Sequence, residues 1–100
     1  MLRRSPIELL TRQARHRDWA RRRDAVQGLA ALSVAEAMVP LLAALKDVHP
    51  AVRSAAAVAL RGHDHPRTVA VLAAALDDDD ASVRAAAATS LGHMSDATAT

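Results

Sequence analysis

The chain repeats itself at an offset of 31 residues, and this feature constrains its fold more than any other. Residues 47–60 (DVHPAVRSAAAVAL) return as residues 78–91 (DDDASVRAAAATSL). The anchor positions of the two copies are Asp47 and Asp78, Val52 and Val83, Arg53 and Arg84, and Leu60 and Leu91. Self-similarity at this period is typical of stacked helix pairs. We therefore predict an all-α fold, a short right-handed α-solenoid of three helix pairs.

The same period extends the pattern to a first copy near the N-terminus. The first helix of each pair places apolar residues at spacings of three and four. These residues are Ile7, Leu10 and Ala14, then Met38, Leu41 and Leu45, then Val69, Leu72 and Leu76. The second helices are predicted over roughly residues 19–31, 50–61 and 81–93. We expect one domain over residues 1–94, with repeats at about 5–32, 35–62 and 67–94, and a polar tail at 95–100 that frays.

Capping residues support these helix starts. Ser5 with Glu8, and Ser33 with Glu36, have the spacing of capping boxes. Pro40 lies inside an apolar stretch, where it either kinks a helix or marks the helix start. The predicted caps of the three second helices are Asp18, His49 and Asp80.

The first copy departs from the pattern at one buried position. Val52 and Val83 head the apolar stripe of the second helices, but Arg21 occupies the same place in the first copy. Two explanations are open: Trp19 covers this site, or the first copy is a terminal cap with a more solvated face, as end repeats of solenoids tend to be.

Composition predicts a thin core and excludes thiol chemistry. Alanine supplies 25 of the 51 hydrophobic residues, Trp19 is the only aromatic residue, and cysteine is absent. Small side chains bring helices close together and leave little room for a cofactor, so we expect none. There is no signal-peptide run and no apolar segment long enough to span a membrane, so we expect a cytoplasmic protein without membrane association. Twelve arginines against one lysine indicate a bacterial, GC-rich genome.

The run from Asp78 to Gly92, an aspartate, a short loop, Val-Arg, several alanines and Leu-Gly, resembles a HEAT repeat. The similarity is greatest to a bacterial subtype that is also found in bilin lyase subunits. This resemblance implies that the loop aspartate accepts backbone N–H groups and that the arginine pairs with the aspartate of a neighbouring repeat. The structural ladder implied in this way consists of Arg22, Arg53, Arg84, Asp47 and Asp78. The first copy departs from the family pattern at His16, which replaces the aspartate, and at Arg21.

No catalytic or metal site is predicted. His63, Asp64 and His65 share one loop, but a fourth ligand is not evident. The run from Asp77 to Asp80 lacks the glycine and the distal glutamate of a calcium-binding loop. Nucleophile motifs, phosphate loops and paired carboxylates in apolar settings are also absent. We therefore expect a protein that is not an enzyme.

The sequence leaves three functional hypotheses. The first is a protein-interaction module or adaptor that binds a protein or peptide on the concave face formed by the second helices. Its candidate residues are Arg23, Gln27, Ser54, Val58, Arg61, Ala85 and Thr89. The second is binding of nucleic acid or another polyanion, because residues 1–23 carry eight arginines against two acidic residues. Its candidate residues are Arg15, Arg17, Arg21, Arg22 and Arg23. The third, implied by the family resemblance, is an accessory subunit of a lyase-like enzyme. A homodimer is also expected, because both end helices of a three-repeat stack present apolar surface.

Overall fold

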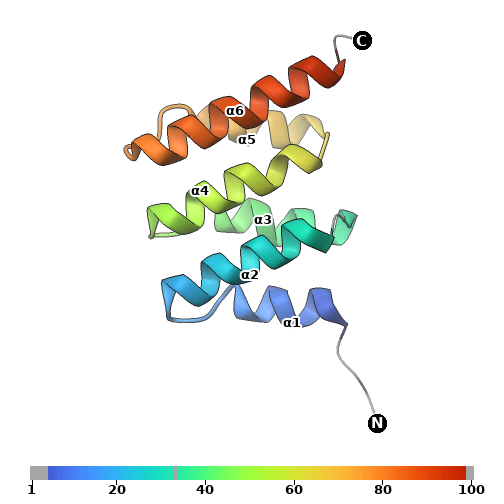
Figure 1. The fold of residues 1–100 in the computed structure, drawn as a ribbon, viewed down its shortest axis with the longest axis vertical. Coiled ribbons are helices and arrows are strands. Elements are labelled where there is room, and N and C mark those ends of the chain that lie inside the picture. The colour runs from blue at the N-terminus through green and yellow to red at the C-terminus, as the bar shows by residue number, and fades with distance from the viewer. Residues whose placement is uncertain (1–4, 33, 99–100) are drawn as a thin grey trace.

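The computed structural model describes residues 5–32 and 34–98, the last four of these by their backbone alone, and over these residues the fold is all-α (Figure 1). The helices follow one another as α1 (Pro6–Gln13), α2 (Trp19–Leu32), α3 (Met38–Ala44), α4 (Pro50–Ala59), α5 (Pro66–Ala75) and α6 (Ala81–Thr98). Short 3-10 turns at Ala35–Ala37 and Leu60–Gly62 precede α3 and follow α4. The predicted α-solenoid of three helix pairs is confirmed.

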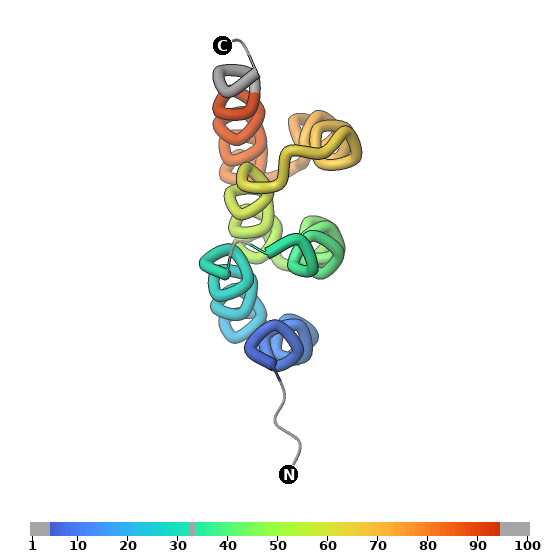
Figure 2. The backbone as a smooth tube through the Cα atoms, turned by 90° about the vertical axis from the view of Figure 1, so that its right-hand side faces the viewer, coloured from blue at the N-terminus to red at the C-terminus, as the bar shows by residue number. Residues whose placement is uncertain are grey.

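The helices form two layers. Figure 2 shows α2, α4 and α6 in one column and α1, α3 and α5 beside it, and the first helix pair and the last helix pair lie at opposite ends of the stack. The whole measures 47 × 31 × 17 Å. The second helices contact one another extensively, whereas α1, α3 and α5 make few contacts among themselves. We call the face that the second helices form the inner face.

The core lies between the two layers and repeats with the sequence. Leu29 and Leu60, equivalent residues of α2 and the turn after α4, have no exposed surface, and Leu41 and Leu72 are their buried partners in α3 and α5. Small residues fill the gaps between them. A methyl group on Gly28 of α2 would lie 2.8 Å from the Leu10 side chain of α1, so glycine permits the close approach of the first pair.

Side-chain caps fix where the helices begin. Ser5 and Glu8 form the predicted capping box, with both N–H to oxygen distances at 3.3 Å. His49 caps α4 through Nδ1, which accepts the N–H of Ala51. The second predicted capping box depends on Ser33, which lies outside the described residues. Pro40 falls in the first turn of α3, so it marks the start of this helix.

The last helix is longer than the sequence predicts. α6 continues to Thr98, past both the expected helix end near residue 93 and the expected domain boundary at residue 94. Gly92 does not end the helix, because the next turn is anchored by Met94, which is 6% exposed and packs in the core. Across the described residues, every helix is too short or too polar to cross a lipid bilayer.

Candidate partner-binding surface

The loops between paired helices hold a ladder of ion pairs. Arg22 of α2 reaches the next repeat and grips Asp47 with two bonds, Nε to Oδ2 at 2.8 Å and Nη2 to Oδ1 at 3.0 Å. Its Nη1 donates to the carbonyl oxygens of His16 and Arg17, both at 2.9 Å. The side chains of the pair are 13% and 12% exposed. This arginine therefore ties its own loop to the loop of the following repeat.

Arg53 of α4 makes the same set of bonds one repeat later. Its Nε and Nη2 donate to Asp78 at 3.0 and 3.1 Å, and Nη1 donates to the carbonyl oxygen of Asp47 at 2.9 Å. The neighbouring Asp79 adds a contact of 3.2 Å from Nη2. Fork-shaped contacts of this kind fix geometry as well as charge. In these two rungs, Arg22 pairs with Asp47 and Arg53 pairs with Asp78.

The ladder carboxylates are stabilised in their charged forms. Burial by itself raises the pKa of Asp47, but hydrogen bonds from Arg22 and from the backbone N–H of His49 hold that pKa below its usual value. The hydrogen bonds from Arg53 lower the pKa of Asp78 in the same way. The pKa of Asp80 is lowered chiefly by the hydroxyl of Ser82, which together with backbone N–H groups contacts this helix cap. These carboxylates hold the scaffold together as acceptors.

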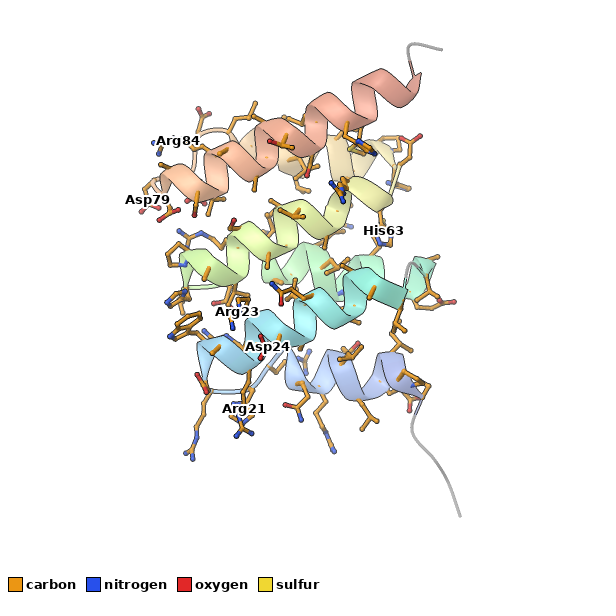
Figure 3. All side chains as sticks on the ribbon, viewed as in Figure 1. Arg21, Arg23, Asp24, His63, Asp79 and Arg84 are labelled. Atoms are coloured by element: carbon orange, nitrogen blue, oxygen red, sulfur yellow. The ribbon has the colours of Figure 1, made fainter. Side chains whose placement is uncertain are left out.

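Arg84 is the third arginine of the series, and its surroundings differ. Its Nη1 donates to the carbonyl oxygen of Asp78 at 2.8 Å, as its counterparts do in their own loops. Among the described residues, however, no carboxylate lies within ion-pair distance of its guanidinium. Figure 3 shows Arg84 at the outer side of α6, away from α4. The ladder therefore has two rungs and an unfilled third position.

The surroundings of Arg21 fit the second of the two alternatives, in which the first copy has a more solvated face. Its side chain is 65% exposed and lies 4.0 Å from Asp18 (Figure 3). Trp19 does not cover it, but stacks on His49 of the next repeat with ring centroids 3.9 Å apart and an interplanar angle of 8°. Arg23 lies over the same ring, 5.2 Å from its centroid. The first repeat thus presents a solvated end face and joins the second through an aromatic stack.

A shallow groove of about 470 Å³ runs between α2 and α4 on the inner face and reaches the start of α6. Its lining combines small apolar residues with a few polar ones. The lining residues are Arg23, Gln27, Ala30, Ala51, Ser54, Ala55, Val58, Ala59 and Ser82. Ser54 joins two of the helices here, because its hydroxyl donates to the carbonyl oxygen of Ser82 at 3.5 Å. A groove of this kind is suited to an extended segment or a helix.

The structure brings together four of the seven residues predicted for a partner site, namely Arg23, Gln27, Ser54 and Val58. Arg61, Ala85 and Thr89 are exposed but lie outside the groove. Sequence reasoning missed the other five lining residues, Ala30, Ala55, Ala59, Ala51 and Ser82. The last two show how such residues could have been found. These two are equivalent residues of successive repeats, so following the groove across repeats, instead of along one helix, would have found them.

The arginines proposed for polyanion binding do not share one surface. Arg22 is held by Asp47, and Arg23 contacts Asp24 at 3.0 Å while it points toward the gap between α2 and α4. Arg15 borders hollows beside α1, whereas Arg17 and Arg21 are exposed at the end of the stack. Three of the five residues therefore remain free of the ladder and the groove.

The histidine loop between α4 and α5 is a structural turn. His65 caps α5, with Nδ1 accepting the N–H of Arg67 at 3.1 Å. His63 lies at the end of the turn that follows α4 (Figure 3). Within the described part of the chain, no three histidine or acidic side chains come close enough together to hold a metal ion.

Comparison with known proteins agrees with the architecture. A family model described as HEAT repeats matches residues 7–92. The structure of human deoxyhypusine hydroxylase in complex with glycerol superimposes with a TM-score of 0.81 and 26% sequence identity. The match covers 90% of this chain but 32% of that protein, so the chain spans about a third of its length. No curated protein matches the sequence.

Proposed function

Because the chain belongs to the HEAT-repeat family, we propose that it is a non-catalytic protein-interaction module that holds a segment of another protein in the groove between α2 and α4. HEAT repeats are in general protein-interaction scaffolds, since stacked helix pairs create long, continuous surfaces. The groove is the single observation that carries the proposal.

The chemistry of the groove supports an apolar segment with a few polar contacts. Val58 is 46% exposed and offers apolar surface at the centre of the groove. Gln27 and Arg23 supply hydrogen-bond donors on the α2 side, and on the α4 side the hydroxyl oxygen of Ser54, whose hydrogen is donated to Ser82, supplies an acceptor. Small alanines between them let a partner backbone approach closely. We expect the partner to present small aliphatic side chains along an extended or helical stretch.

The charge states of the described residues support a non-catalytic role. Each acidic group whose pKa is shifted is shifted toward its charged form, and each is held by an arginine or by a helix start. Catalytic acids and bases need the opposite kind of shift, toward a pKa near neutrality. The hydroxylase activity of the similar structure is not carried over, because the match covers 32% of that protein.

A displayed peptide library selected on the wild-type protein tests this proposal. We expect selected peptides to bind Val58→Glu at least about tenfold more weakly, because the new charge would be desolvated against an apolar partner. Val48→Glu is the matched control, since Val48 is 88% exposed in a loop outside the groove. Fluorescence anisotropy measures both affinities. Peptides that bind the two variants equally well would contradict the groove as the partner site.

A second candidate, polyanion binding, is favoured by the exposure of Arg17 and Arg21 at the N-terminal end. The informative variant replaces Arg15, Arg17 and Arg21 by alanine and keeps Arg22, which the ladder needs. Salt-titrated mobility shifts with single-stranded and double-stranded DNA and with RNA measure binding. If the wild type binds none of them at low salt, this candidate is excluded.

A further inference from the structure

We propose that the C-terminal end of the stack, formed by α5 and α6 around Arg84, is a second docking site, and that it binds a helix pair of another polypeptide whose connecting loop presents an aspartate. This surface is separate from the groove between α2 and α4, so the two proposals stand or fall independently.

The ladder shows which chemical group Arg84 is prepared to bind. Arg22 and Arg53 each hold one carboxylate of the following loop with Nε and Nη2, while Nη1 is anchored in their own loop. Arg84 keeps this anchor to the carbonyl oxygen of Asp78. Its Nε and Nη2 meet no carboxylate among the described residues. The guanidinium is thus positioned for a carboxylate that the described residues do not supply.

The surface beside Arg84 is apolar at positions that are covered elsewhere in the stack. Ala57 in α4 has no exposed surface, whereas its counterpart Ala88 in α6 is exposed. Leu45 is partly buried after α3, but its counterpart Leu76 after α5 is 39% exposed. Val69 of α5 is 41% exposed, whereas its counterpart Met38 of α3 is partly buried. An exposed apolar surface together with an arginine that has no carboxylate partner is better suited to contact with a further helix pair than to contact with water.

The opposite end of the chain cannot serve as this partner. His16 stands where a loop aspartate would be needed, so it offers no carboxylate to Arg84. Arg21 and Asp24 replace Val52 and Ala55 of the middle repeat and are exposed. A charged face of this kind disfavours head-to-tail stacking of identical chains. The occupant is therefore a different polypeptide that carries the loop carboxylate and an apolar helix face.

A variant of the chain itself provides a defined probe. Substitutions His16→Asp, Arg21→Val and Asp24→Ala give its N-terminal end the residues that the middle repeat uses to bind its neighbour. Arg84→Glu at the other end prevents the probe from binding itself. We expect a 1:1 complex between this probe and the wild-type protein in sedimentation velocity, whereas neither protein alone forms such a pair.

The dependence on Arg84 is the decisive measurement. The single variant Arg84→Ala should bind the probe at least about tenfold more weakly than the wild-type protein does, because the carboxylate of the probe loses its partner. Arg61→Ala is the matched control and should bind as the wild type does, since Arg61 is an exposed arginine away from this end. Isothermal titration calorimetry gives the three affinities.

Two outcomes would overturn the proposal. One is a folded probe, judged by circular dichroism, that forms no complex with the wild type at about 1 mM protein. The other is a complex that forms equally well with the Arg84→Ala receptor. If the fourfold variant does not fold, a probe with His16→Asp and Arg84→Glu alone replaces it, and its results are judged by the same two criteria.

Discussion

Arg53 and Arg84 occupy the same position in successive repeats, each between a buried valine and a run of alanines, yet their surroundings differ. Arg53 is 15% exposed and holds two carboxylates, whereas Arg84 is exposed and keeps the bond to its own loop. The difference comes from the neighbouring repeat: among the described residues, Arg53 has the loop of a following repeat beside it and Arg84 does not. In a stack, the same residue is therefore a structural element inside and a free binding group at the end.

The N-terminal end shows the contrasting solution. Position 52 of the middle repeat is a buried valine, and the same position in the first repeat is Arg21, which is solvated. The first repeat thus ends the stack with charge, as terminal repeats commonly do. The last repeat keeps Val83 buried and leaves its outer surface apolar. The described residues at the two ends of the stack therefore differ in charge and in exposed apolar surface.

Exchange of residues between the first and middle repeats should have the largest effect. Val52→Arg places a charge without a partner in a site with no exposed surface, so we expect a loss of more than about 4 kcal/mol of unfolding free energy, or failure to fold. The reverse change, Arg21→Val, should alter stability by no more than about 0.5 kcal/mol. Urea unfolding followed by circular dichroism measures both. Similar losses in the two variants would show that the first repeat is not a cap.

Removal of a ladder arginine should lower the stability more inside the stack than at its end. Arg53→Ala leaves the partly buried Asp78 without its partner and should cost about 2–4 kcal/mol. Arg84→Ala removes only a bond to a backbone carbonyl at the surface and should leave the unfolding midpoint nearly unchanged. Arg53→Lys keeps the charge but loses the fork, so its midpoint should fall between those of the wild type and Arg53→Ala. Equal midpoints for the two alanine variants would exclude the ladder as a stabilising feature.

Much of this fold can be predicted from the sequence, because a repeated pattern indicates both where the helices lie and how successive helix pairs stack. The positions of Val52, Leu60 and Leu91 give the helix faces, and the 31-residue offset gives their stacking. Caps such as Ser5 are equally local, because their partners lie within one turn. Periodicity and capping therefore predict the helices and their pairing.

The rest depends on contacts between repeats that one copy does not encode. The stack of Trp19 on His49 needs two residues 30 positions apart with different chemistry, so no repeat pattern reveals it. The cap of α5 by His65 is not predicted by the repeat, because the equivalent residue one repeat earlier is Val34, whose side chain cannot cap a helix. Ser82 lines the groove because the start of α6 lies beside α4, and the sequence of a single helix does not show this neighbour.

Acid titration should sharpen the comparison between the two rungs and the open end. The pKa values of Asp47 and Asp78 are lowered in the folded state, so their stabilising contribution is present above the unfolded aspartate pKa of about 3.9. It is lost as the pH falls through the lower folded values. We expect the urea midpoint of the wild type to drop below about pH 4. This decrease in the urea midpoint should be smaller in Arg53→Ala, which already lacks one rung. In Arg84→Ala it should be as large as in the wild type. An acid limb of the same steepness in all three proteins would contradict this assignment.

His16→Asp should have the smallest effect, and its smallness is informative. His16 accepts the N–H of Asp18 through Nδ1 at 3.0 Å, and Asp47 accepts the N–H of His49 through Oδ1 at 2.9 Å. An aspartate can therefore replace the histidine in its loop without loss of the turn, and we expect stability to change by about 0.5 kcal/mol or less. Thermal unfolding measures this change. If the turn forms with either residue, the histidine is not needed for it. The consequence of having histidine here is then that the first repeat has no carboxylate at this loop position. A large destabilisation would instead mean that His16 is required for folding. The missing carboxylate at this position would then be a consequence of that requirement.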